Sequence, residues 1–230
     1  MSYIYDFEPQ TETEIRVVRE KNQAPDFLYS LVPYYKRKDL TSGEKVEIGN
    51  YQDIHPWNVQ KDWSIPIPES WKEKRDCYVL NSFSRFPDFS QSLSAGEIKI
   101  ISDRTLKIDS AIGKSRWKDE RFIYRGVFDD SWLLNPSVGS IFTEKAFGSF
   151  SLAPHQAYNY MNPEFPILFQ LRLTKGMNAL YIDDTEYEIL RPRNSIYEII
   201  KIFKEKRQIT PNLYREVLIY NIEEVKTEEE

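Results

Sequence analysis

The sequence predicts an α+β fold in which a helical N-terminal part packs on a two-sheet, mixed β core. Apolar residues recur at helical spacing in the first half of the chain. After about residue 113 the pattern changes to the two-residue alternation that is typical of strands. With 230 residues, 40% of them hydrophobic, the chain is long enough for one large domain or a compact pair.

Helices are predicted from apolar spacing and from capping residues. Ser70 is a good N-cap, and Glu73 stands at the position that completes a capping box. Residues 36–69 are rich in charge, Gly, Pro and Asn, so we expect a long, partly packed loop with short elements there. The expected helices lie near residues 27–32 and over residues 71–84 and 103–113.

Strands are predicted where apolar and polar residues alternate. The pattern is clearest over 166–175, where every second residue is apolar, and it indicates a half-buried strand. Residues 223–230 (EEVKTEEE) form an acidic end that we expect to be frayed. The expected strands cover residues 122–128, 166–175, 178–182, 186–191, 196–203 and 215–222.

The composition excludes several classes of protein. The net charge of -5 does not suit a nucleic-acid binder, so no nucleic-acid partner is expected. Cys77 is the single cysteine and His55 and His155 are the only histidines, so we expect neither a disulfide nor a metal site. We find no secretory signal and no apolar stretch that could span a bilayer. The expected location is therefore the cytoplasm in which the protein is made, with no membrane partner.

Glu186 and Glu188 are the first candidates for chemistry. In a strand, residues two apart point to the same face, so both carboxylates are expected on one face. Like charges this close disfavour joint ionisation and raise at least one pKa, which suits acid–base chemistry or stabilisation of a cationic transition state. The alternative is an ordinary solvent-facing strand that carries two glutamates.

Arg125 and a serine-rich turn are the next candidates. Arg125 lies on an otherwise apolar strand face, so it needs an anionic partner, either a bound pyrophosphate or a structural carboxylate. Gly126 beside it allows a ligand to approach the backbone closely. In the 147–154 turn (FGSFSLAP), small hydroxyl residues could orient a neighbouring carboxylate.

The order and spacing of these three groups resemble the mono-ADP-ribosyltransferase family of the arginine-first type. That family includes the enzymatic components of binary toxins, Rho-modifying exoenzymes, phage transferases and vertebrate ecto-enzymes. Its signature is an aromatic-Arg-Gly strand, then a Phe-x-Ser-x-Ser turn, then a Glu-x-Glu or Gln-x-Glu strand. The chain has FIYRGV, FGSFS and TEYEILRPRNSIYEI in the same order, and the resemblance covers roughly residues 75–222. It implies an ADP-ribosyltransferase-like fold and NAD⁺ as a substrate.

The resemblance also implies a role for each residue. Arg125 would bind the NAD⁺ phosphates, and the Gly126 backbone would hold the nicotinamide amide. Ser149 would orient Glu188, which would contact the nicotinamide ribose and stabilise its positive charge as nicotinamide departs. Glu186 would position or deprotonate the acceptor, and a glutamate there goes with arginine acceptors in this family.

The chain departs from the family pattern in two ways. Phe150 replaces the usual threonine of the serine motif, and no second phosphate-binding arginine follows that motif. Arg85, near Asn81 in the expected 71–84 helix, is a candidate substitute, and Tyr160 is a candidate to stack on nicotinamide. The implied catalytic set is Glu188, Glu186 and Ser149, and the implied NAD-binding set is Arg125, Gly126, Ser151, Tyr160, Arg85 and Asn81.

The resemblance thus implies a mono-ADP-ribosyltransferase that modifies a protein acceptor, with arginine as the expected target and nicotinamide as the product. Two alternatives stay open: an NAD⁺ glycohydrolase that uses water, and a catalytically silent NAD-binding module. We expect the transferase domain over 66–230 and an N-terminal extension over 1–65, which could select the partner or simply complete the core. Action in another cell after delivery, or in an infected host cell, is compatible with such an enzyme.

Overall fold

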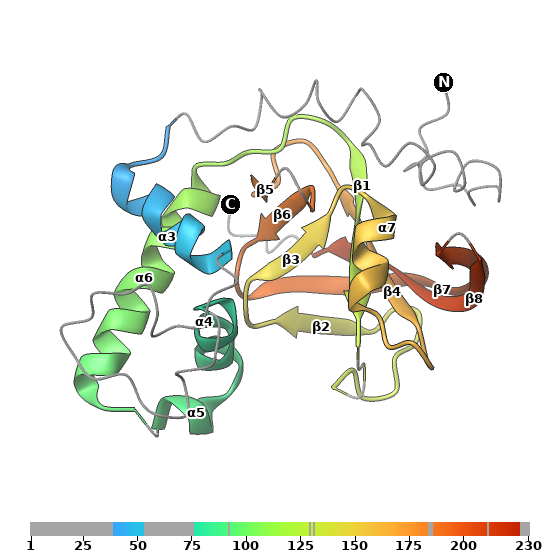
Figure 1. Cartoon of the computed structure of the whole chain (residues 1–230), viewed down its shortest axis with the longest axis horizontal. Helices are drawn as coiled ribbons and strands as arrows, with labels where there is room; N and C mark the ends of the chain where they lie inside the picture. Colours follow the sequence, from blue (N-terminus) through green and yellow to red (C-terminus); the bar gives the residue numbers. More distant parts are fainter. Residues whose placement is uncertain are drawn as a thin grey trace.

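The computed structural model describes residues 39–52, 76–91, 93–128, 130, 132–183, 186–210 and 212–225. Four helices come first along this part of the chain, and eight strands follow with one short helix and a 3₁₀ turn among them, so the expected α+β class is confirmed (Figure 1). No helix within the described residues has the length and hydropathy required to cross a membrane. The expected helix near 27–32 lies outside the described residues.

The helices differ in their bounds from the sequence prediction. They are α3 (Ser42–Gln52), α4 (Asp76–Arg85), α5 (Pro87–Gln91), α6 (Ala95–Gly113), α7 (Pro154–Ala157) and the 3₁₀ turn η2 (Tyr158–Tyr160). The helix expected over 71–84 is α4 in its described part, whereas Ser70 and Glu73 lie outside the described residues. The expectation of only loop and short elements over 36–69 was wrong, because an eleven-residue helix, α3, lies within it.

Helix α6 begins eight residues before the expected start at residue 103. Its N-terminus is a full capping box. The Glu97 N–H donates to the Ser94 hydroxyl at 3.3 Å, and the Glu97 carboxylate accepts the Ser94 N–H at 2.7 Å. These two bonds satisfy backbone donors that the first helical turn leaves unpaired. The Ser-x-x-Glu spacing was present in the sequence and gives the true start.

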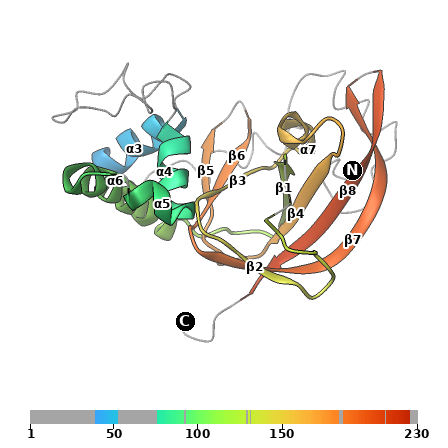
Figure 2. The same cartoon turned by 90° about the horizontal axis from the view of Figure 1, so that it is seen from below.

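Helices α3 to α6 form one layer against one end of the sheet. Figure 2 shows α3 to α6 grouped beside β5, β6 and β3, with β7 and β8 on the far side. A buried apolar cluster joins the layer to those strands, and its members include Ile48 on α3, Leu80 on α4, Ile108 on α6 and Leu190 on β6. Buried apolar area of this kind holds the helical layer in place. Helix α3 thus shares a core with residues beyond 66, while the expected division at residue 65 stays a prediction.

The strands form a single mixed sheet. They are β1 (Arg121–Val127), β2 (Ile141–Glu144), β3 (Gly148–Ser151), β4 (Ile167–Leu173), β5 (Leu180–Asp183), β6 (Glu188–Arg191), β7 (Ser195–Thr210) and β8 (Leu213–Glu224). Their order in the sheet is β2-β7-β8-β4-β1-β3-β6-β5. The β4–β8 pair is parallel and the other pairs are antiparallel. All six expected strands are present, and β2 and β3 are additional.

The two parts of the expected β core form one continuous sheet, because all eight strands are linked by hydrogen bonds. Strand β1 makes the link. It pairs with β4 along its whole length and with β3 through the single residue pair Tyr124–Ser151. Such a short pairing lets the two parts of the sheet lie at a steep angle, and Figure 2 shows the resulting curvature.

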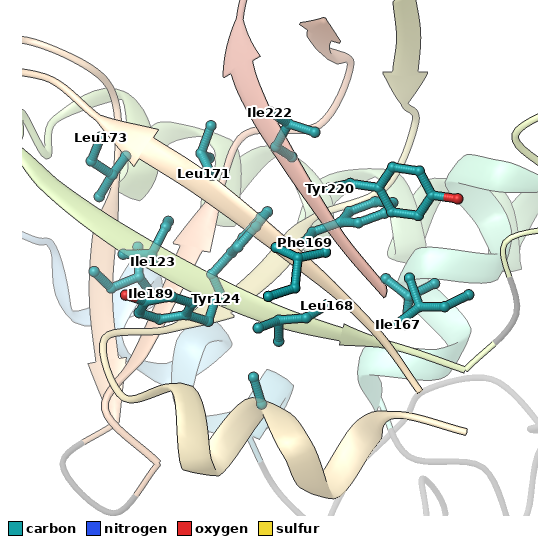
Figure 3. Close-up of a cluster of buried hydrophobic side chains, with 14 of the residues drawn as sticks. Ile123, Tyr124, Ile167, Leu168, Phe169, Leu171, Leu173, Ile189, Tyr220 and Ile222 are labelled. Carbon is teal, nitrogen blue, oxygen red and sulfur yellow. The ribbon is translucent and has the colours of Figure 1, made fainter. Parts of the chain in front are cut away.

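The larger apolar core includes residues of β1, β4, β6 and β8, with others from β3, β5 and β7. Figure 3 shows ten labelled members, among them Ile123 on β1, Phe169 on β4 and Ile222 on β8. Strand β4 is buried on both faces except at Arg172, so the expectation of a half-buried strand was wrong. The second face is covered because residues of α7 and η2, including Ala157 and Tyr158, pack in the same cluster.

Candidate active site

Arg125, on β1, has the anionic partner that its position demanded. Its Nη1 lies 2.8 Å from Oε2 of Glu144, the last residue of β2. Arg85, from the C-terminal turn of α4, binds the other oxygen of the same carboxylate at 3.0 Å through Nη2 and 3.1 Å through Nε. The structure therefore brings the two candidate phosphate-binding arginines together around one carboxylate that the sequence analysis did not single out.

Glu144 is ionised in this arrangement. Burial raises its pKa, but the charges of Arg125 and Arg85, with a backbone N–H bond from Ala146, outweigh burial and lower the pKa overall. The Ala146 N–H donates to Oε1 at 3.0 Å. A buried, ionised carboxylate with two guanidinium partners is a fixed part of the structure.

Close backbone packing requires a glycine at position 126, and the sequence did not reveal this reason. A Cβ built on Gly126 would lie 2.1 Å from the carbonyl oxygen of Ala157 and 2.9 Å from the backbone N of Met161. Backbone atoms cannot retreat from such a contact as a flexible side chain can. The glycine therefore lets α7 and η2 approach β1, and the expected contact of its backbone with nicotinamide stays a prediction.

Ser149 and Ser151 lie on strand β3, although the sequence was interpreted as a turn. Strand β3 pairs antiparallel with β6, and Ser151 stands opposite Glu188 in that pairing. The Ser149 hydroxyl donates a hydrogen bond to Oε1 of Glu188. The Ser151 hydroxyl donates instead to the backbone carbonyl of Glu186 at 2.6 Å, so it holds the turn that precedes β6.

Glu188 has a raised pKa. Burial raises its pKa, the Ser149 hydrogen bond lowers it, and the charges of Glu186 and Asp183 raise it, with a net value of about 7. The sequence predicted a raised pKa from the proximity of Glu186 alone. The structure shows that burial is the larger cause.

The geometry of the Glu186–Glu188 pair differs from the prediction. Strand β6 begins at Glu188, and Glu186 lies in the turn before it. Between them Tyr187 has a φ of 52°, a left-handed conformation that costs about 1 to 2 kcal/mol for a residue with a side chain. The two carboxylates still converge, but a left-handed turn brings them together rather than the alternation of a strand.

Tyr160 and Asp183 complete the group around the two glutamates. The Tyr160 hydroxyl donates to Oε1 of Glu186 at 2.8 Å, so the tyrosine that was expected to stack on nicotinamide contacts Glu186. Asp183, which stands opposite Glu188 beside a β-bulge of β5, was missed by the sequence analysis. Oxygens of Asp183, Glu186 and Glu188 lie within 4.8 Å of one another. Such a group can face a cation or a cationic side chain.

Asn81 links helices α3 and α4 to the residue that precedes β3. Its amide nitrogen donates to the Tyr51 hydroxyl at 3.0 Å, and its amide oxygen accepts the Phe147 N–H at 3.2 Å. Tyr51, on α3, was also missed, and burial is the largest cause of its raised pKa. Its ring packs edge-on against Phe147 at 5.8 Å between centroids. The helical layer therefore contacts the chain just before β3, the strand that carries Ser149 and Ser151.

Comparisons with known proteins concern the family and the fold of the chain. The family model of the ADP-ribosyltransferase exoenzymes matches residues 90–220, more than half of the chain. A comparison with curated protein sequences finds no match.

Solved structures of ADP-ribosyltransferases resemble the fold. The Plx2a toxin of Paenibacillus larvae is 19% identical, with 91% of this chain and 98% of that chain covered and a TM-score of 0.60. The enzymatic component C2-I of the Clostridium botulinum C2-toxin is 16% identical, with 88% and 48% covered and a TM-score of 0.63. The ADP-ribosyltransferase Vis, in complex with agmatine, is 18% identical, with 98% and 91% covered and a TM-score of 0.59. At these identities the likeness shows the fold alone, but the family model adds the sequence evidence: the chain belongs to the ADP-ribosyltransferase exoenzyme family.

Proposed function

We propose that the protein transfers ADP-ribose from NAD⁺ to a guanidinium group of a protein acceptor and releases nicotinamide. The observation that carries this proposal is the Ser149–Glu188 hydrogen bond, which fixes a half-buried carboxylate beside a second glutamate. Family membership supports the transferase class. The choice of NAD⁺ and of arginine as the acceptor rests on the resemblance and on the chemistry of the site.

The pyrophosphate of NAD⁺ would bind Arg125 and Arg85. Their side chains are 24% and 32% exposed, and each guanidinium has N–H donors beyond those that Glu144 accepts. Paired guanidinium groups suit a pyrophosphate because each can donate to two oxygens. Ser151 and Asn81 would act through the backbone that they hold, and Gly126 would offer its backbone to the nicotinamide amide.

Glu188 would act at the ribose. As the bond between the anomeric carbon and the nicotinamide nitrogen breaks, its electron pair leaves with nicotinamide and positive charge grows on the ribose. An ionised Glu188 held by Ser149 stabilises that charge, and the half-buried setting strengthens the effect. The acceptor nitrogen then bonds to the anomeric carbon.

Glu186 would act on the acceptor. A guanidinium is protonated at neutral pH and must lose a proton as it attacks, and the Glu186 carboxylate can accept that proton. Tyr160 holds this carboxylate in place, and Asp183 adds a second negative group for a cationic side chain. The complex of Vis with agmatine, a guanidinium compound, is in keeping with such an acceptor in this fold.

The first test uses purified protein, NAD⁺ labelled on the adenylate group, agmatine, and a eukaryotic or bacterial extract. Labelled agmatine or a labelled protein band, both lost in Glu188→Gln, would support the proposal. Nicotinamide release without any labelled acceptor would favour the glycohydrolase. Tight NAD⁺ binding without nicotinamide release would favour the catalytically silent module.

The setting of the reaction is part of the same proposal. The similar structures include toxins, so we propose a protein target in a cell that the enzyme enters or occupies. Label transfer in extracts from several hosts would identify that target.

A further inference from the structure

We propose that Glu144 is a positioning residue for dinucleotide binding: it holds Arg125 and Arg85 side by side so that both guanidinium groups face one pyrophosphate. This inference rests on the proposed function, because it assumes that the two arginines bind the phosphates of NAD⁺. Glu144 itself would not touch the substrate.

The first support is the way one carboxylate serves two elements. Oε2 of Glu144 binds Arg125 of β1 at 2.8 Å, and Oε1 binds Arg85 of α4 at 3.0 Å. The Arg125 guanidinium also lies over the Phe150 ring at 6.0 Å, but Glu144 is the group that both arginines bind. The orientation of each long side chain therefore depends on Glu144, which reduces the rotamer freedom that phosphate binding must otherwise restrict.

The second support is the difference in exposure. The Glu144 side chain is 7% exposed, whereas those of Arg125 and Arg85 are 24% and 32% exposed. The carboxylate is thus buried, whereas both arginine side chains remain partly open to the solvent. This order allows an anion to reach the arginines from outside without displacing Glu144.

The third support is the balance of donors and charge. Glu144 accepts from Nε and Nη2 of Arg85 and from Nη1 of Arg125, so N–H donors remain on both groups for phosphate oxygens. Two cations and one anion leave one positive charge. Without Glu144 the two guanidinium groups would repel each other and separate.

A second interpretation has the opposite consequence. If Glu144 mainly competed with the pyrophosphate for the arginines, its removal would strengthen NAD⁺ binding. The backbone N–H bond from Ala146 and the ionised state of the buried carboxylate argue for a fixed support instead. The sign of the change in affinity separates the two interpretations.

The test measures ADP-ribose binding by calorimetry and NAD⁺ kinetics with the full chain carrying Glu144→Gln. We expect the Kd for ADP-ribose and the KM for NAD⁺ to rise at least tenfold, with kcat changed by less than threefold. Glu47→Gln is the matched control, because Glu47 is also buried and binds two cations, Arg104 at 2.7 Å and Lys107 at 3.4 Å. It should lower the Tm without changing either constant.

Several outcomes would overturn the inference. An unchanged or lower Kd in folded Glu144→Gln would do so, and so would a loss of kcat with an unchanged KM. If Glu144→Gln does not fold, Glu144→Asp keeps the charge but shortens its reach, and it should raise the KM at least threefold. An unchanged KM in folded Glu144→Asp would refute the positioning role. If the wild-type protein neither binds ADP-ribose nor releases nicotinamide, the proposed function fails, and this is distinct from a failure in the variant alone.

Discussion

The Ser149 hydroxyl donates a hydrogen bond to the Glu188 carboxylate across the β3–β6 strand pair. This bond offsets part of the effect of burial on Glu188, whose pKa is nevertheless raised to about 7. The protonation state of the proposed catalytic carboxylate therefore changes within the physiological pH range, and Ser149 influences where the change occurs.

The pH dependence of catalysis should report this relationship. Since only ionised Glu188 can stabilise the ribose cation, kcat/KM for NAD⁺ should fall below a pH of about 7. Ser149→Ala removes a bond that lowers the pKa, so the acidic limb should move to higher pH and the rate at pH 7 should fall several-fold. The rate of nicotinamide release between pH 5 and pH 9, measured for wild type and for Ser149→Ala, gives the acidic limb of each. An acidic limb at the same pH in Ser149→Ala would contradict the assignment.

Stability should depend on the same carboxyl group. The pKa of Glu188 is raised from 4.5 to about 7, so its contribution to folding is fully present below pH 4.5 and is lost as the pH rises through 7. Glu188→Gln cannot ionise, so its free energy of unfolding should not show this loss. Relative to wild type, the free energy of unfolding of the variant should therefore be about 3 kcal/mol higher at pH 8 than at pH 4. Urea unfolding at the two pH values checks this. Glu216→Gln, an exposed change on β8, should show no such gain.

Gly126 should be intolerant of a side chain. In Gly126→Ala the new Cβ would meet backbone atoms of Ala157 and Met161, so we expect a loss of about 3 kcal/mol in the free energy of unfolding. Gly49→Ala is the control, because nothing lies within 4 Å of that position in α3. It should stabilise the protein by about 0.5 to 1 kcal/mol. Equal effects of the two substitutions on the free energy of unfolding would show that the close approach of the backbone does not require a glycine at position 126.

Glu186 should separate transfer from NAD⁺ cleavage. Glu186→Gln keeps the shape but cannot accept the acceptor proton, so transfer to agmatine should fall at least tenfold more than hydrolysis of NAD⁺. Tyr160→Phe removes the hydroxyl bonded to Glu186 and should weaken transfer by a smaller factor. Labelled agmatine and free nicotinamide, measured in the same reaction, give the two rates. Equal losses of transfer and hydrolysis would assign Glu186 to nicotinamide release instead.

Elements with local signals could be predicted from the sequence. Alternation over 122–128 and 166–175 placed β1 and β4, since a strand repeats every two residues whatever it packs against. The capping box at Ser94 would have placed the start of α6 in the same way. The ordered Arg, Ser and Glu motifs indicated the family, which the match over 90–220 confirms.

The contacts that support these motifs exist only in the folded chain. Glu144 lies at the end of a four-residue strand, and nothing near it in sequence reveals that α4 and β1 bring Arg85 and Arg125 to it. The left-handed Tyr187 is held by the Leu152 N–H, which donates to its carbonyl at 3.0 Å, and by the Ser151 bond to Glu186. Such contacts join residues far apart in the chain. Local periodicity cannot show them, because their energies depend on burial and distance that exist only once the sheet has curved and the helices have packed against it.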